Sequence, residues 1–206
     1  MVQINFNWWG YTFQEGINVL RQSFISARDA LNRDVELARE EAIGYQESVD
    51  QGLIEPDIEY EDGIAILDHA DVLQMHVETA EDGAMALRKA FVIAAYHLWE
   101  RSARGWTKSE HGKHPKLIAL TLAQGYPISQ KLDAVRDLVN LLKHAREKWG
   151  IDLMASWPQV FAPSFQGSPK TDWYEAVSLT DEHVFEVFET LADSGPTTSN
   201  TGQTTP

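Results

Sequence analysis

The feature that most constrains this chain is a helical period in its apolar residues, which runs through two long stretches of the first half. From Phe13 to about Asp50, apolar residues recur at steps of three and four, which places them on one side of a single long helix. After an acidic connection, the same period resumes at Ile64 and continues to Arg104, with Gly83 as the expected break. No strand pattern is evident. We therefore expect an all-α helical bundle with a long antiparallel helix hairpin.

Length and composition favour one domain in a reducing compartment. The chain has 206 residues, of which 43% are hydrophobic, enough for a single sizeable core over residues 1–193. The hairpin should take up about 13–104 and the core about 87–192, while the low-complexity residues 194–206 should be a disordered tail. The absence of cysteine excludes disulfides and thiolate metal sites. Neither a signal-peptide pattern nor a membrane-length apolar run is present, so we expect a soluble cytoplasmic protein without membrane partners.

Charge is unevenly distributed along the chain. The net charge is −14, but the segment from Arg88 to Lys148 holds twelve Lys/Arg against five Asp/Glu, which leaves −21 for the rest. Such asymmetry lets one face attract a polyanion while the remainder repels it. The alternative is that the basic segment is neutralised by folding against the acidic one.

The segment from Ser129 to Trp149 separates apolar from polar residues most cleanly, and it predicts a helix with Ser129 as N-cap and Gly150 just past its end. One side of this helix is apolar. The other carries Arg136, Asn140 and His144 at intervals of four, together with Asp137 and Lys143. Any surface helix shows a polar side, so a solvated face is the alternative to a functional site.

A second polar stripe ends the second long helix, with His97, Glu100, Arg101 and Arg104 spaced to share one side. If the two helices are neighbours, both stripes meet in one groove. Imidazoles that move protons beside cations that stabilise phosphate charge suit phosphodiester chemistry without a metal. The alternatives are a locally bonded histidine at the core edge for His97, and an ordinary surface ion pair for Glu100 with Arg104.

Other candidate chemistry is weaker, and we expect neither a metal nor a cofactor. His111 and His114 lie in a lysine-containing loop without a nearby carboxylate or thiolate, which falls short of a metal site. His69 and His76 are interpreted as part of a solvated face. No phosphate-binding glycine loop, nucleophile elbow or dinucleotide fingerprint is present. Thr180 predicts the N-cap of a last helix.

Three segments resemble the HEPN superfamily, in particular its branch related to the RiboL-PSP-HEPN proteins of bacterial defence islands. They are AFVIAAYHLWERSAR from Ala90, VRDLVNLLKHAREKWG from Val135, and the stretch Trp157–Phe161. The resemblance implies a helical bundle that forms two-fold dimers, and in many members a metal-independent ribonuclease. It assigns Arg136 as the motif arginine and His144 as the motif histidine.

The resemblance also carries Asp137 over as the polar residue beside the motif arginine. Seven residues separate Arg136 from His144, whereas the family has four to six, so it stays open whether Asn140 and Lys143 take the place of Arg136.

The expected function is a metal-independent endoribonuclease of bacterial stress or phage defence, with RNA as substrate and a homodimer as the working form. A 2′-hydroxyl would attack the adjacent phosphate, with His144 in proton transfer and Arg136 or Lys143 stabilising the charge. The alternative is a non-catalytic HEPN-like binding or sensor protein, which acts through a nucleotide or through a protein partner on the acidic hairpin. A third possibility is a structural helical protein without a ligand.

Overall fold

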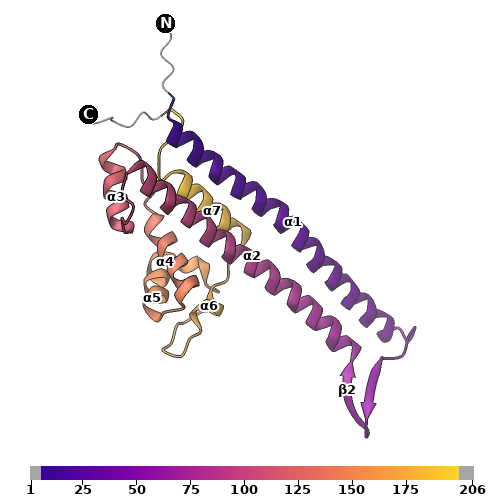
Figure 1. Ribbon diagram of the computed structural model, residues 1–206. Coiled ribbons are helices and arrows are strands. Elements are labelled where there is room, and N and C mark those ends of the chain that lie inside the picture. The colour runs from indigo at the N-terminus through magenta and orange to yellow at the C-terminus, as the bar shows by residue number, and fades with distance from the viewer. Residues whose placement is uncertain (1–5, 200–206) are drawn as a thin grey trace. The chain divides into compact units, whose positions relative to one another are not determined.

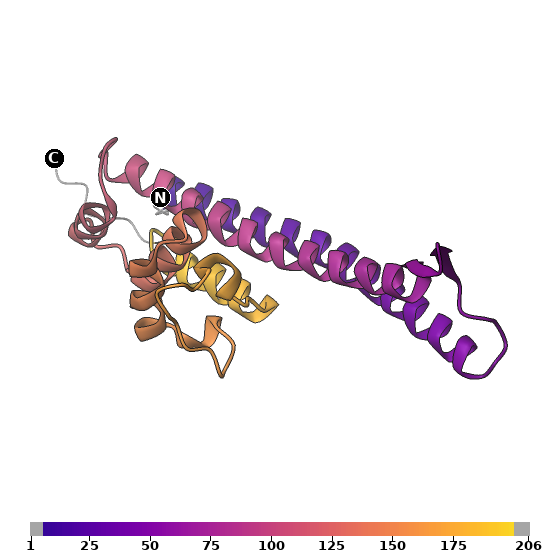
Figure 2. The same ribbon diagram turned by 90° about the horizontal axis from the view of Figure 1, so that it is seen from below.

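The computed structural model describes residues 6–199 and confirms the all-α class (Figures 1 and 2). Within these residues, seven α-helices accompany a single two-stranded sheet and one short 3₁₀ helix. The elements are α1 (Trp8–Asp50), β1 (Ile58–Glu61), β2 (Ile64–Asp68), α2 (His69–Trp106), α3 (His114–Ala123), α4 (Leu132–His144), α5 (Glu147–Ser156), η1 (Pro158–Val160), α6 (Trp173–Ala176) and α7 (Asp181–Ala192). Over the same range, no helix combines the length and apolarity needed to cross a membrane.

The chain divides into two compact units. Unit 1 consists of residues 1–24 and 88–206, and unit 2 consists of residues 25–87. Both α1 and α2 contribute to both units, because the boundaries fall inside these helices. The single domain expected over residues 1–193 stays a prediction.

Unit 2 contains parts of α1 and α2 that run side by side, joined by the sheet (Figures 1 and 2). Val35 of α1 and Val77 of α2 are buried, as the apolar period predicts. An ion pair between Arg39 and Glu81 links the two helices. In this unit, the antiparallel helix hairpin has the expected arrangement.

The sheet corrects the predicted start of the second long helix, because Ile64 belongs to β2 and α2 begins only at His69. Asp62 (φ 50°) and Gly63 (φ 79°) both adopt the left-handed conformation, as tight hairpin turns require. An Asp-Gly pair flanked by isoleucines and a tyrosine is the sequence signal for this turn. Gly83, the expected break, lies inside an uninterrupted α2.

The core of unit 1 is aromatic and brings α1, α2 and α7 together. The Phe24 ring lies 5.4 Å from Phe91 and 6.3 Å from Phe188, and Trp99 of α2 is fully buried beside Tyr96 and His114. Helix α7 begins as predicted: the Thr180 hydroxyl accepts the backbone N–H of His183 and forms a capping box with it.

The helix predicted from Ser129 to Trp149 is in fact two helices. Helix α4 ends at His144, where Ala145 turns into the left-handed conformation (φ 48°), and α5 starts at Glu147. Gly150 therefore lies inside α5 instead of ending a helix. A Cβ there would approach the Trp173 ring to 2.0 Å, which explains the glycine. Ser129 does not cap α4; its backbone N–H donates to the Ser194 hydroxyl.

The predicted disordered tail begins too early. Ser194 is fully buried, and its carbonyl accepts the indole N–H of Trp99. The Gln14 amide donates to the Pro196 carbonyl over 3.3 Å. The backbone N–H of Asn7 donates to the Thr198 carbonyl over 3.0 Å. These hydrogen bonds, which composition does not reveal, hold Ser194, Pro196 and Thr198 against the rest of unit 1. Residues 200–206 lie outside the described part of the chain.

Candidate functional site

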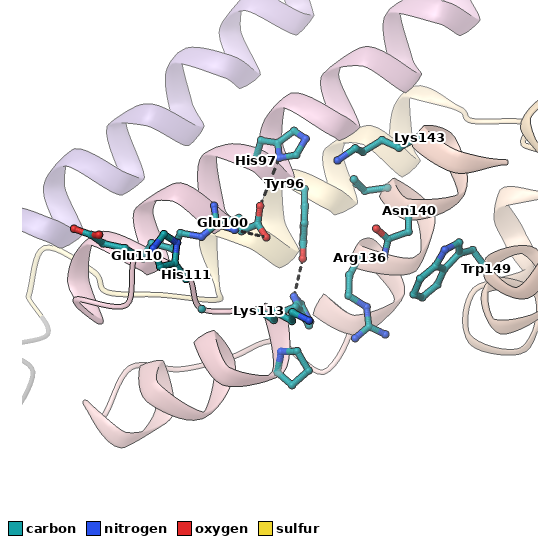
Figure 3. A pocket seen from close by; sticks show the side chains of 15 residues that line it. Tyr96, His97, Glu100, Glu110, His111, Lys113, Arg136, Asn140, Lys143 and Trp149 are labelled. Atoms are coloured by element: carbon teal, nitrogen blue, oxygen red, sulfur yellow. Dashed lines mark hydrogen bonds and ion pairs between the residues drawn. The ribbon is translucent and has the colours of Figure 1, made fainter. Parts of the chain in front are cut away.

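Unit 1 contains a cavity of about 730 Å³ between α2, α4, the start of α5 and the loop before α3. Side chains from α2 and α4 point toward one another across it (Figure 3). From the two predicted stripes, the cavity is lined by His97, Glu100, Arg104, Arg136, Asn140 and Lys143. The structure thus brings together most of both stripes in the groove that the sequence suggested.

Three of the candidate residues lie elsewhere. Arg101 lines a neighbouring cavity of about 630 Å³, on another side of α2. Asp137 is buried and pairs with Arg136, so it does not lie on the exposed polar face predicted for it. His144 is exposed as the last residue of α4 and does not line the cavity.

Residues outside the two predicted stripes complete the lining. The loop before α3 contributes Glu110, His111 and Lys113, followed by His114 at the first position of α3. Tyr96 of α2 and Trp149 of α5 supply aromatic surface. The only sequence signal was the His-Gly-Lys-His run, which indicates imidazoles but not their neighbours.

A buried imidazole connects three of the elements around the cavity. His114 is 5% exposed, with Nδ1 2.7 Å from the Tyr96 hydroxyl and Nε2 3.0 Å from Asp133. An ionised carboxylate only accepts hydrogen bonds, so Nε2 carries the proton and Nδ1 accepts from Tyr96. The result is a continuous chain from phenol to imidazole to carboxylate.

The surroundings keep both His114 and Tyr96 neutral. Burial lowers the pKa of His114, the Arg136 guanidinium lowers it further, and the hydrogen bond to Asp133 opposes both. Burial raises the pKa of the Tyr96 hydroxyl, and the charge of Glu100 adds to the rise. At neutral pH, the imidazole is therefore an unprotonated acceptor beside a protonated phenol.

Arg136 is held rigidly at the cavity wall. Its guanidinium lies 2.8 Å from an Asp137 oxygen and 3.3 Å from Asp133, and 5.9 Å from the centre of the Trp149 ring. Burial raises the pKa of the Asp137 carboxyl, and the hydrogen bonds and charge of Arg136 counteract that rise. Asp137 therefore orients the guanidinium and does not line the cavity itself.

On the α2 side, Glu100 contacts a guanidinium and an imidazole. Its carboxylate lies 2.9 Å from Arg104 and 3.7 Å from the imidazole of His97. The pair with Arg104 is the i, i+4 pair foreseen in the sequence, here at the edge of a cavity. The Nε of Arg104 is buried and finds no hydrogen-bond acceptor among residues 6–199.

The cavity has a cationic excess. Four cations, from Arg104, Lys113, Arg136 and Lys143, line it together with two carboxylates, from Glu100 and Glu110. Imidazole and aromatic surfaces make up much of the remaining lining. Such a cavity attracts an anion that also carries a flat ring. Within residues 6–199, no group of three or more metal-ligating side chains is arranged to hold a metal ion.

This arrangement is the basis for a functional proposal, because the charges, the imidazoles and the aromatic rings all belong to one cavity in one unit. Comparison of the chain with protein-family models, with curated proteins and with solved structures found no match.

Proposed function

We propose that the cavity binds the phosphodiester backbone of an RNA strand, and that the chain is a metal-independent endoribonuclease of the kind that the HEPN resemblance implies. The observation that supports this most is the joining of cations from α2 and α4 with a buried, neutral imidazole in one cavity. Cations oppose the charge that grows on a phosphate under attack, and a neutral imidazole accepts a proton.

The proposed reaction assigns the proton to His114 instead of His144. The RNA 2′-oxygen attacks phosphorus and gives its proton to the Tyr96 oxygen, while Tyr96 passes its own proton to Nδ1 of His114. Asp133 stabilises the resulting imidazolium through Nε2. The bond from phosphorus to the 5′-oxygen breaks, and that oxygen takes the proton that His97 carries when its imidazole is protonated. Tyr96 stays neutral throughout, which agrees with the raised pKa of its hydroxyl.

The test is cleavage of single-stranded RNA in EDTA by the wild-type chain and by folded variants. We expect His114→Asn to lower the rate by at least about 100-fold, as removal of a proton-transfer group does. Lys143→Ala should also lower it, because that ammonium lines the cavity. The matched control is His144→Ala, one residue further along α4 and outside the cavity, which should cleave like wild type.

Loss of cleavage in His144→Ala with retention in His114→Asn would contradict the assignment to this cavity and favour the motif histidine. Absence of metal-independent cleavage by the folded wild-type chain would contradict the ribonuclease proposal as a whole.

The biological setting rests on the resemblance alone. It supports a cytoplasmic protein of bacterial stress or phage defence that works as a two-fold homodimer. Light scattering on the purified chain should then give twice the mass of 23.2 kDa. Expression in bacteria should slow growth, and the His114→Asn variant should relieve that effect. A monomer, or equal growth with both proteins, would contradict this setting.

A second function, nucleotide binding without cleavage by a sensor protein, is favoured by one observation. Both carboxylates beside Arg136 already neutralise its guanidinium, which reduces the charge it offers to a transition state. Calorimetry with a nucleoside triphosphate separates the two functions. Binding that weakens in Lys143→Ala, without any turnover of RNA, would favour the sensor.

A further inference from the structure

Unit 2 carries the entire negative excess of the chain. Residues 25–87 contain 17 Asp/Glu and three Lys/Arg, a net charge of −14, which equals that of the whole chain. From residue 40 to residue 87 there are 14 Asp/Glu and not one Lys or Arg. This unit therefore repels other anions, including nucleic acid, and attracts a cationic partner.

The sheet of unit 2 exposes large apolar side chains. Every residue from 51 to 67 is exposed except Ile58, which is half-buried. Tyr60 is 64% exposed, Ile64 69% and Ile66 56%. An isolated two-stranded hairpin is marginally stable in water, because neither of its faces is buried. Apolar side chains so exposed mark a surface that a partner covers.

Strand β1 carries both acidic and apolar side chains, and the two kinds alternate along it. Its sequence Ile58-Glu59-Tyr60-Glu61 alternates apolar and acidic residues, which by strand geometry puts the two apolar side chains on one face and the two carboxylates on the other. The pairing of β1 with β2 shifts register between Glu59 and Tyr60. β1 pairs with β2 along one edge only, and within the described residues no strand pairs with its second edge. A free edge presents unpaired backbone donors and acceptors to any extended segment.

We propose that the free edge of β1 binds an extended segment of a partner protein in which basic and apolar residues alternate. Backbone hydrogen bonds add the segment as a third strand. Its cations lie beside Glu59 and Glu61, and its apolar side chains lie beside Ile58 and Tyr60, as cross-strand neighbours do.

The same charges exclude a second copy of this chain as the occupant. Pairing β1 with β1 would bring glutamates next to glutamates, in a unit that already carries 14 negative charges in excess. The acidic strand thus prevents this edge from pairing with the same edge of a second copy, and at the same time it selects a basic partner. This inference is independent of the cavity in unit 1 and of its proposed chemistry.

The experiment uses the full chain and a synthetic heptapeptide, Lys-Val-Lys-Val-Lys-Val-Lys, blocked at both ends. Hydrogen exchange should slow at the amides of residues 58–61 when the peptide binds, and calorimetry should give an affinity that falls as salt rises. A control peptide of the same composition with its four lysines in one block has the same charge but no alternation. It should give no protection of β1.

Two charge-reversed proteins locate the binding. The double variant Glu59→Lys/Glu61→Lys should bind the alternating peptide about tenfold more weakly, because two cross-strand attractions become repulsions. The matched control Glu36→Lys/Glu40→Lys makes the same charge change on exposed positions of α1 in unit 2. It should bind within about twofold of wild type, since only the general field changes.

Equal weakening in both double variants, equal protection by both peptides, or no slowing of exchange in β1 would each overturn the proposal. Exchange in α1 and α2 verifies that both variants keep their fold. Because no cavity residue is altered, RNA cleavage by the variants should equal that of the wild-type chain, and this result separates the proposal from the ribonuclease proposal.

Discussion

At the scale of single residues, burial decides which histidine can do chemistry. His114 is enclosed between Tyr96 and Asp133, whereas His144 is exposed at a helix end. Both are histidines beside lysines in the sequence, and His144 has the more suggestive spacing from Arg136. Only the packing of α3 against α2 and α4 places an imidazole where a low dielectric and a fixed partner set its protonation.

The lowered pKa of His114 has a consequence for stability. In the unfolded chain this imidazole titrates near its ordinary value of 6.5, and in the folded chain it titrates lower. Between these two values the unfolded chain binds more protons, so the free energy of unfolding falls as the pH drops below about 6.5. One such group contributes a slope of at most about 1.4 kcal/mol per pH unit.

We therefore expect the free energy of unfolding of the wild-type chain, measured with urea, to fall from pH 7.5 to pH 5.5. In His114→Gln it should fall less over the same range. All seven tryptophans belong to unit 1, so their fluorescence follows the unit that contains His114. Burial also lowers the pKa of His183. This second group stays in the variant, so part of the slope remains. The control His144→Gln should keep the wild-type slope, and an unchanged slope in His114→Gln would contradict the expected titration.

At the scale of elements, two helical glycines have opposite surroundings. Gly83 lies in α2 with no atom near the position of a Cβ, while Gly150 lies in α5 directly under the Trp173 ring. We expect Gly83→Ala to stabilise unit 2 by about 0.5–1 kcal/mol, because alanine loses less backbone entropy in a helix. Gly150→Ala should destabilise unit 1 by about 1–3 kcal/mol through overpacking.

Hydrogen exchange at residues 69–87 measures the first change, and tryptophan fluorescence during urea unfolding measures the second. Gly44 in α1 has an equally open site, so Gly44→Ala should act like Gly83→Ala. If Gly150→Ala were as stable as the wild-type chain, α5 and Trp173 would not pack as described.

A second prediction at this scale concerns the start of α7. The Thr180 hydroxyl accepts the backbone N–H of His183, and the imidazole of His183 accepts the backbone N–H of Thr180. Thr180→Ala removes one side of this capping box and should cost about 1 kcal/mol of stability. Thr180→Ser keeps the hydroxyl and is the control. Equal losses in the two variants, measured by urea unfolding, would show that the cap does not contribute.

Helices in which the apolar spacing persists over many turns could be predicted from the sequence. Elements that depend on local geometry or on tertiary contacts could not. The two long helices follow from apolar spacing, and Thr180 marks α7. The break at Ala145 has no glycine or proline to signal it. The loop residues Glu110 and Lys113 enter the cavity only because α3 packs where it does. The turn at Asp62 had a signal in its Asp-Gly pair, but the helical period continued through it and obscured the strand.

At the scale of the whole molecule, charge is partitioned between the two units. Unit 1 contains 14 Lys/Arg and 14 Asp/Glu, so its net charge is zero, while unit 2 carries −14. The sequence alone showed a basic segment and an acidic remainder. It did not show that unit 1 would be neutral, which follows because the acidic residues 172–193 near the end of the chain belong to the same unit as the basic segment.

This partition predicts opposite responses to salt. Repulsion among the carboxylates of unit 2 destabilises its compact state, and raising KCl from 10 mM to 1 M shortens the screening length from about 30 Å to about 3 Å. Hydrogen exchange should therefore slow in the helical residues of unit 2, at 25–50 and 69–87. In unit 1, salt also weakens attractive pairs such as Arg88–Asp181, so exchange there should stay constant or rise.

The comparison within one sample provides the control, since both units share the same solvent and the same intrinsic exchange chemistry. Replacing KCl by an equal osmolality of sucrose stabilises compact states without screening and should slow exchange in both units. A salt effect of equal size in the two units would mean that general salting effects outweigh the repulsion. Faster exchange of unit 2 at high salt would mean that its few ion pairs, such as Arg39–Glu81, outweigh the repulsion among its carboxylates.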